Sequence, residues 1–105
     1  MKVQLKDIAN VIRSKNAGPF ELTLDVLLKD AETFEKVKYA NIINQEVIAK
    51  LYCIPVEDVL SIVYFPNANA IKATIVRPLP SGAMGERDVY GAQQHAPLVN
   101  FSFEL

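Results

Sequence analysis

Residues 59–75, with the sequence VLSIVYFPNANAIKATI, decide the fold because they hold two strand patterns separated by a turn. Residues 59–65 are mostly β-branched or aromatic and are apolar on both faces except at Ser61, which predicts a central strand. The Pro and Asn in residues 66–69 are typical of a turn. Apolar and polar residues then alternate through residues 71–75. We therefore expect the two strands to pair as a hairpin.

Further strands are expected on both sides of this hairpin. In residues 21–26, Leu and Val alternate with Glu, Thr and Asp, which is the pattern of a strand with one buried face. Residues 2–6 alternate more briefly, and we expect a turn over residues 7–10. The clearest alternation lies in residues 99–105. Its Val and Phe side chains predict a last strand that lies in the core or pairs with a second chain.

Two helices are expected between the strands. Asp30 is a candidate N-cap for the first helix, and Asn41 interrupts its apolar pattern. Asn44 is a candidate N-cap for the second helix, which must end before Pro55. Cys53 has apolar neighbours in this helix, so we expect it to be a small buried hydrophobe.

These patterns together predict the fold class. The expected order is β-β-α-α-β-β-β, which favours an α+β fold: a mainly antiparallel four- to five-stranded sheet with two helices on one face. At 105 residues, half of them hydrophobic, the chain can bury a core without metal or disulfide support. We expect one domain, residues 1–105.

Composition excludes several classes of function. The net charge of -1 carries no electrostatic signature of nucleic-acid or anionic-membrane binding, so neither partner is expected. One Cys and one His leave no internal disulfide and no metal cluster, and the glycines match no dinucleotide or phosphate motif, so no cofactor is expected. The N-terminus alternates charged and apolar residues, and no run approaches a membrane span. We expect a cytoplasmic protein.

The first candidate site is a polar loop predicted over residues 13–18. Arg13, Ser14, Lys15 and Asn16 bring two cations, a hydroxyl and an amide together, just before a glycine. Arginine offers a planar fork to a carboxylate or phosphate, and lysine a point charge. The alternative is a solvated loop whose arginine pairs with an acid, for which Asp25 is the best candidate.

The second candidate site is the loop that precedes the last strand. Residues 79–97 show little periodicity, and a loop of that length is usually functional or part of an interface. It carries Tyr90, Gln93, Gln94 and His95. His95 is a candidate general base because its ordinary pKa lies near neutrality. The alternative is that these amides and the imidazole cap backbone groups.

Two residues of the hairpin complete the candidate set. Asn69 lies in the turn, where Asn is favoured for backbone reasons alone, and Lys72 lies on the second strand. Lys72 would add positive charge to an anion site; the alternative is a solvated lysine on a polar face.

The chain resembles domain-of-unknown-function family 4387. The resemblance rests on residues 5–20 (LKDIANVIRSKNAGPF), residues 69–72 (NAIK) and residues 90–98 (YGAQQHAPL). A fainter similarity links Leu5, Asp7, Ala9, Arg13 and Ser14 to the opening of the C-terminal domain of AtuA-type (acyclic terpene utilisation) proteins, a domain described as ferredoxin-like. The chain departs from that pattern after the serine, with KNAG in place of Gly-Asp-Lys-Gly.

The resemblance implies a small partner subunit, because members of the family tend to be encoded beside AtuA-type large proteins. Our leading hypothesis is an accessory or site-completing subunit of an AtuA-type enzyme of organic-acid or acyl-CoA breakdown, with a homo-oligomer also expected. Its ligand would be a carboxylate or thioester at a composite site. Two alternatives stay open: a free-standing lyase or isomerase that uses His95 and Arg13, and a non-catalytic ligand-binding or regulatory module.

Overall fold

The computed structural model describes residues 2–18, 20–76 and 96–105, which include two sheets and their covering helices. In chain order the elements are β1 (Lys2–Gln4), α1 (Leu5–Ile8), β2 (Ala9–Asn16), β3 (Glu21–Leu28), α2 (Ala31–Tyr39), α3 (Gln45–Tyr52), the 3₁₀ turn η1 (Val56–Asp58), β4 (Val59–Phe65), the 3₁₀ turn η2 (Pro66–Ala68), β5 (Ala70–Val76), α4 (Ala96–Val99) and β6 (Ser102–Glu104). The α+β class predicted from the sequence is confirmed.

The main sheet has four antiparallel strands in the order β2-β3-β5-β4. β3 and β4 both run antiparallel to β5, which lies between them, and α2 and α3 connect them. This is the split β-α-β unit found in ferredoxin-like folds. The other half differs from the β-α-β-β-α-β order of that fold, because β2 joins β3 directly as a hairpin.

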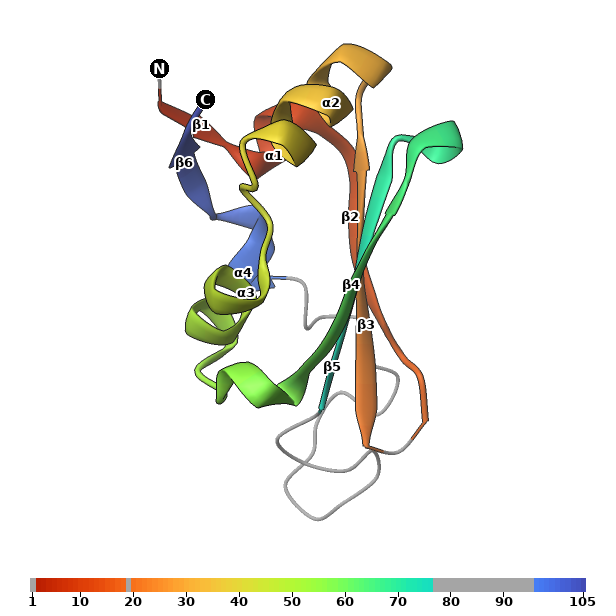
Figure 1. Cartoon of the computed structure of the whole chain (residues 1–105), viewed down its shortest axis with the longest axis vertical. Coiled ribbons are helices and arrows are strands. Elements are labelled where there is room, and N and C mark those ends of the chain that lie inside the picture. Colours follow the sequence, from red (N-terminus) through yellow and green to blue (C-terminus); the bar gives the residue numbers. More distant parts are fainter. Residues whose placement is uncertain (1, 19, 77–95) are drawn as a thin grey trace.

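All four helices of the described residues lie on one side of this sheet (Figure 1). α2 contacts β3, and α3 contacts β4. The core lies between the sheet and these two helices. It is formed by residues of β3, β5, α2 and α3 that are 2% exposed or less: Leu22, Leu24, Val26, Phe34, Val37, Ile48, Ile71, Ala73 and Ile75. As far as the described residues define it, the sheet therefore has a face covered by helices and a second face, here called the open face, that they leave uncovered.

The predicted hairpin of residues 59–75 is confirmed, with β4 and β5 joined through η2. The prediction that residues 59–65 form a central strand is wrong, since β4 lies at the edge of the sheet as the described residues define it. Apolar residues on both faces did not mark a central strand here, because Val63 and Phe65 on one face are 42% and 45% exposed. The strand expected over residues 99–105 also differs. That segment begins inside α4, and only Ser102–Glu104 is a strand, which pairs with β1 beside the main sheet instead of joining it.

Two predictions for the N-terminal segment are also wrong. The turn expected over residues 7–10 is the end of α1 and the start of β2. The loop expected over residues 13–18 is largely strand: β2 extends to Asn16 and pairs with β3. The polar composition of this segment conceals an alternation, in which Arg13 and Lys15 face one side and Ser14 faces the other.

The helix predictions are confirmed at their N-termini. Asp30 accepts a hydrogen bond from the Thr33 backbone N–H at 2.7 Å, and Asn44 accepts one from that of Val47 at 2.9 Å. The prediction for Cys53 is wrong, because this residue is exposed. It ends α3 in the left-handed conformation with φ 56°, which turns its side chain away from the apolar stripe of the helix.

Candidate functional site

The open face of the main sheet brings three of the predicted site residues together. Side chains alternate along each strand, so every second residue of β2, β3, β5 and β4 points away from the helices. The register places these residues in three rows that cross the sheet: Val11-Leu27-Ala70-Phe65, Arg13-Asp25-Lys72-Val63 and Lys15-Thr23-Thr74-Ser61. No helix or strand among the described residues covers them (Figure 1).

The middle row places an acid between two cations. Arg13 donates from Nε to the Asp25 carboxylate at 3.0 Å. Lys72 lies opposite Asp25 on the next strand. The Asp25 side chain is only 17% exposed, whereas that of Arg13 is 60% exposed. The sequence prediction that Asp25 is the partner of a cation is confirmed.

The next row is made of Lys15 and three hydroxyl residues. Thr23 is buried at 4% exposure and donates from Oγ1 to the backbone carbonyl of Lys15 at 3.2 Å. This bond ties β3 to β2 beside the middle row. With Glu21, which lies beyond this row on the same face, the cations Arg13, Lys15 and Lys72 outnumber the acids by one.

The third row is apolar and ends on the edge strand. Val11 is 38% exposed and Phe65 is 45% exposed at the two ends of the row. Val63, which ends the middle row, is 42% exposed. β4 carries no charged residue along its seven positions. The open face therefore combines an excess of cations with apolar side chains that face solvent.

The other predicted site residues do not share this face. Ser14 is buried on the covered face, opposite Leu24, so a ligand on the open face would contact the side chain of Arg13 but not that of Ser14. Asn16 follows on the covered side. Asn69 adopts the left-handed conformation with φ 52° at the end of η2, which is a turn requirement. Tyr90, Gln93, Gln94 and His95 lie outside the described residues.

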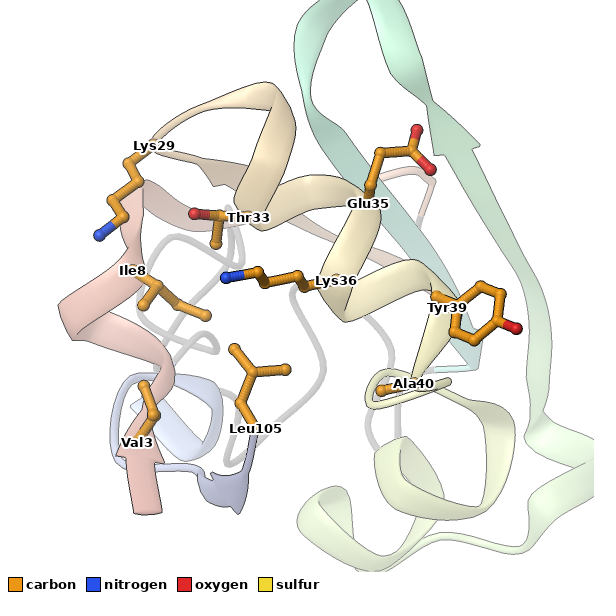
Figure 2. A pocket seen from close by; sticks show the side chains of 9 residues that line it. All are labelled: Val3, Ile8, Lys29, Thr33, Glu35, Lys36, Tyr39, Ala40 and Leu105. Carbon is orange, nitrogen blue, oxygen red and sulfur yellow. The ribbon is translucent and has the colours of Figure 1, made fainter. Parts of the chain in front are cut away.

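A groove that sequence analysis missed lies on the opposite side of the molecule, beside α2. It has a volume of about 740 Å³. Its lining comes from both ends of the chain and from α2: Val3, Ile8, Lys29, Thr33, Glu35, Lys36, Tyr39, Ala40 and Leu105 (Figure 2). The helical spacing of Thr33, Lys36 and Ala40 marks one side of the groove, but no local pattern links these residues to the chain ends.

Tyr52 and Tyr64 have raised pKa values but line neither the open face nor the groove. Burial raises the pKa of Tyr52 and, more weakly, that of Tyr64. The Tyr64 hydroxyl donates to the backbone carbonyl of Ile43 at 3.2 Å, and its ring meets Phe34 edge-on. These tyrosines therefore support the core. Over residues 2–18, 20–76 and 96–105, no three His, Cys, Asp or Glu side chains are grouped to hold a metal ion.

The sheet and its covering helices define an α+β protein in which the described residues leave one polar sheet face uncovered. The chain belongs to the family described as Domain of unknown function (DUF4387), whose model matches residues 5–102. This confirms the family predicted from the sequence, and the description names no activity. No curated protein and no solved structure matches the chain significantly. In the part of the chain that the structure describes, no helix is long and apolar enough to cross a membrane.

Proposed function

We propose that the chain is a small accessory or site-completing subunit of an AtuA-type two-component enzyme of organic-acid or acyl-CoA catabolism. In this proposal the open face docks on the large subunit, and the two chains share a site for a carboxylate or thioester. The observation that carries the proposal is the middle row, in which Arg13 and Lys72 flank Asp25 beside exposed apolar side chains. The faint likeness to AtuA-type proteins supplies the identity of the partner.

The apolar part of the open face supports docking to another chain. Val63 and Phe65 are large apolar side chains that face solvent on an edge strand, and protein interfaces use such side chains in their centres. Edge strands that stay unpaired are usually protected by charges or proline. β2 has Arg13 and Lys15 at the opposite edge of the described sheet, whereas β4 has no charged residue.

The cationic part of the open face supports binding of an anion. Asp25 engages Nε of Arg13 and so fixes the direction of the guanidinium, whose remaining N–H donors are at the Nη atoms. A carboxylate, or a phosphate group of the CoA moiety of a thioester, can accept from such donors in a bidentate manner. Lys72 adds a second cation on the far side of Asp25. Docking of a partner would exclude water and strengthen these contacts.

Co-purification tests the docking surface. The chain is co-expressed with an AtuA-type large protein, and one of the two proteins carries an affinity tag. Val63→Glu places a charge in the apolar end of the middle row, where the nearby Lys72 can pair with it, so folding should be preserved. Val56→Glu is the matched control, because Val56 is 45% exposed and lies in η1, away from the open face.

We expect the wild-type chain and Val56→Glu to be retained with the large protein and Val63→Glu to be lost. Equal retention of Val63→Glu and Val56→Glu by the large protein would show that the open face is not the docking surface. Turnover of small organic acids or CoA esters by the purified chain alone would overturn the subunit assignment itself.

A further inference from the structure

The groove beside α2 has the form of a small-molecule site. α2 forms one wall, while Val3 of β1, Ile8 of α1 and Leu105 form the other (Figure 2). Its volume of about 740 Å³ falls within the range of about 300–1,000 Å³ that is typical of ligand sites. Its lining residues come from β1, α1, α2 and Leu105 and include none of the open face, and α1 and α2 lie on the helical side of the sheet (Figure 1).

The apolar side chains of the two walls are together called the apolar floor of the groove. Ile8 is 8% exposed, and Leu105, at 39%, is one of the more exposed large apolar side chains of the described residues. Val3 and Ala40 complete the apolar surface. An alkyl chain laid along these side chains would remove apolar area on both partners from water, which favours binding by about 0.8 kcal/mol per buried CH₂.

The rim of the groove carries two lysines. The side chains of Lys29 and Lys36 both extend over the space beside Ile8, whereas those of Glu35 and Tyr39 point to the other side of α2 (Figure 2). The cations of the lining therefore gather at one end of the apolar floor, and its acid lies apart from them.

Two acids at the start of α2, Asp30 and Glu32, already have other partners or form only an exposed ion pair. Asp30 caps α2 through Thr33. Glu32 pairs with Lys36 at 3.4 Å, with side chains that are 79% and 61% exposed. Exposed pairs of this kind contribute about 0.5 kcal/mol or less. A ligand carboxylate brought to Lys36 by its own alkyl chain can displace Glu32 at little cost.

We propose that this groove binds a medium-chain aliphatic carboxylate, with the alkyl chain on Val3, Ile8 and Leu105 and the carboxylate at Lys36 and Lys29. The charge arrangement favours an anionic head, and the apolar floor favours an acid with an alkyl tail over a small polar acid. This inference does not depend on the proposed function, because it uses none of the residues of the open face.

Titration of the full chain with sodium octanoate tests the proposal, with binding followed by calorimetry and by methyl signals in NMR. We expect one site per chain and shifts at Ile8 and Leu105 but not at Val11 or Val63 of the open face. Hexanoate should bind about fifteenfold more weakly, because it lacks two CH₂ groups, each of which accounts for a factor of about four. Octanol, which has the same tail without the charge, should bind at least fivefold more weakly than octanoate.

Three variants distinguish a specific contact with the carboxylate from nonspecific hydrophobic binding. Lys36→Gln should weaken octanoate binding at least fivefold. Lys50→Gln is the matched control, because Lys50 is an exposed lysine of α3 outside the groove, and it should leave binding unchanged. Glu32→Gln removes the competing carboxylate and should tighten binding about twofold.

Several results would overturn the proposal. They are the absence of saturable binding, octanol binding as tight as that of octanoate, and equal effects of Lys36→Gln and Lys50→Gln. Shifts confined to the open-face methyls would also overturn it, while favouring the anion site proposed for that face.

Discussion

The two faces of the main sheet are built from the same strands and have opposite compositions. On β3, Leu22, Leu24 and Val26 face the helices and are 2% exposed or less, while Thr23 and Asp25 between them face the other side. Because the side-chain period of a strand is two, one short segment serves both faces. The buried apolar side chains that stabilise the sheet therefore lie on its covered face, while its charged residues lie on the open face.

The prediction with the largest expected effect compares two truncations, one on each face of the main sheet. Leu24→Ala should lower the free energy of unfolding by about 3 kcal/mol, because it leaves a cavity in a core position that is 1% exposed. Val63→Ala, at 42% exposure, should change it by about 0.5 kcal/mol or less. Urea denaturation followed by circular dichroism measures both. Comparable losses would mean that the open face is part of the core.

Local patterns predicted most of the covered side. The β3 alternation, the Asp30 and Asn44 caps and the β4–β5 hairpin each depend on residues a few positions apart, so composition and spacing were sufficient. Cys53 was misassigned for a local reason that spacing does not show. Its left-handed backbone at the end of α3 removes it from the helical stripe that its neighbours follow.

The sites were less predictable because they depend on pairing between distant segments. Arg13 and Lys72 were both candidates, but only the register through Asp25 shows that they lie in one row. Ser14 was grouped with Arg13 as though both lay in a loop, whereas the pleat of β2 sends them to opposite faces. The groove could not be found at all, since its walls join Val3 and Leu105 to α2.

A second prediction addresses how the helices are held on the covered face. Asn44→Ala should lower the free energy of unfolding by about 1 kcal/mol at pH 7 and at pH 3, because a neutral amide caps α3. Asp30→Ala should also destabilise at pH 7, but its penalty should depend on pH. The hydrogen bonds from the side chain and backbone of Thr33 hold the pKa of Asp30 below its ordinary value of 3.8.

The sign of this dependence follows from linkage. A carboxyl whose pKa is lower in the folded state contributes stability above its unfolded pKa and loses it as the pH falls through the folded value. The difference between Asp30→Ala and the wild-type chain should therefore shrink below about pH 3.8, while that of Asn44→Ala stays constant. Urea denaturation at both pH values gives the two differences. A constant difference for Asp30→Ala would show that its charge has no part in the cap.

The smallest expected effect is on the open face itself. Asp25→Asn replaces the charged partner of Arg13 and leaves three cations in the two polar rows, yet Arg13 is 60% exposed, so water screens much of the change. We expect a loss of about 0.5–1 kcal/mol at low salt that falls by at least half in 0.5 M NaCl, because screening weakens the repulsion among Arg13, Lys15 and Lys72. Glu32→Gln, which removes a more exposed pair, is the control and should cost less at both salt concentrations. A salt-independent loss for Asp25→Asn would mean that Asp25 stabilises the fold through its hydrogen bond alone, and that the charges of the open face are too well separated to act on one ligand.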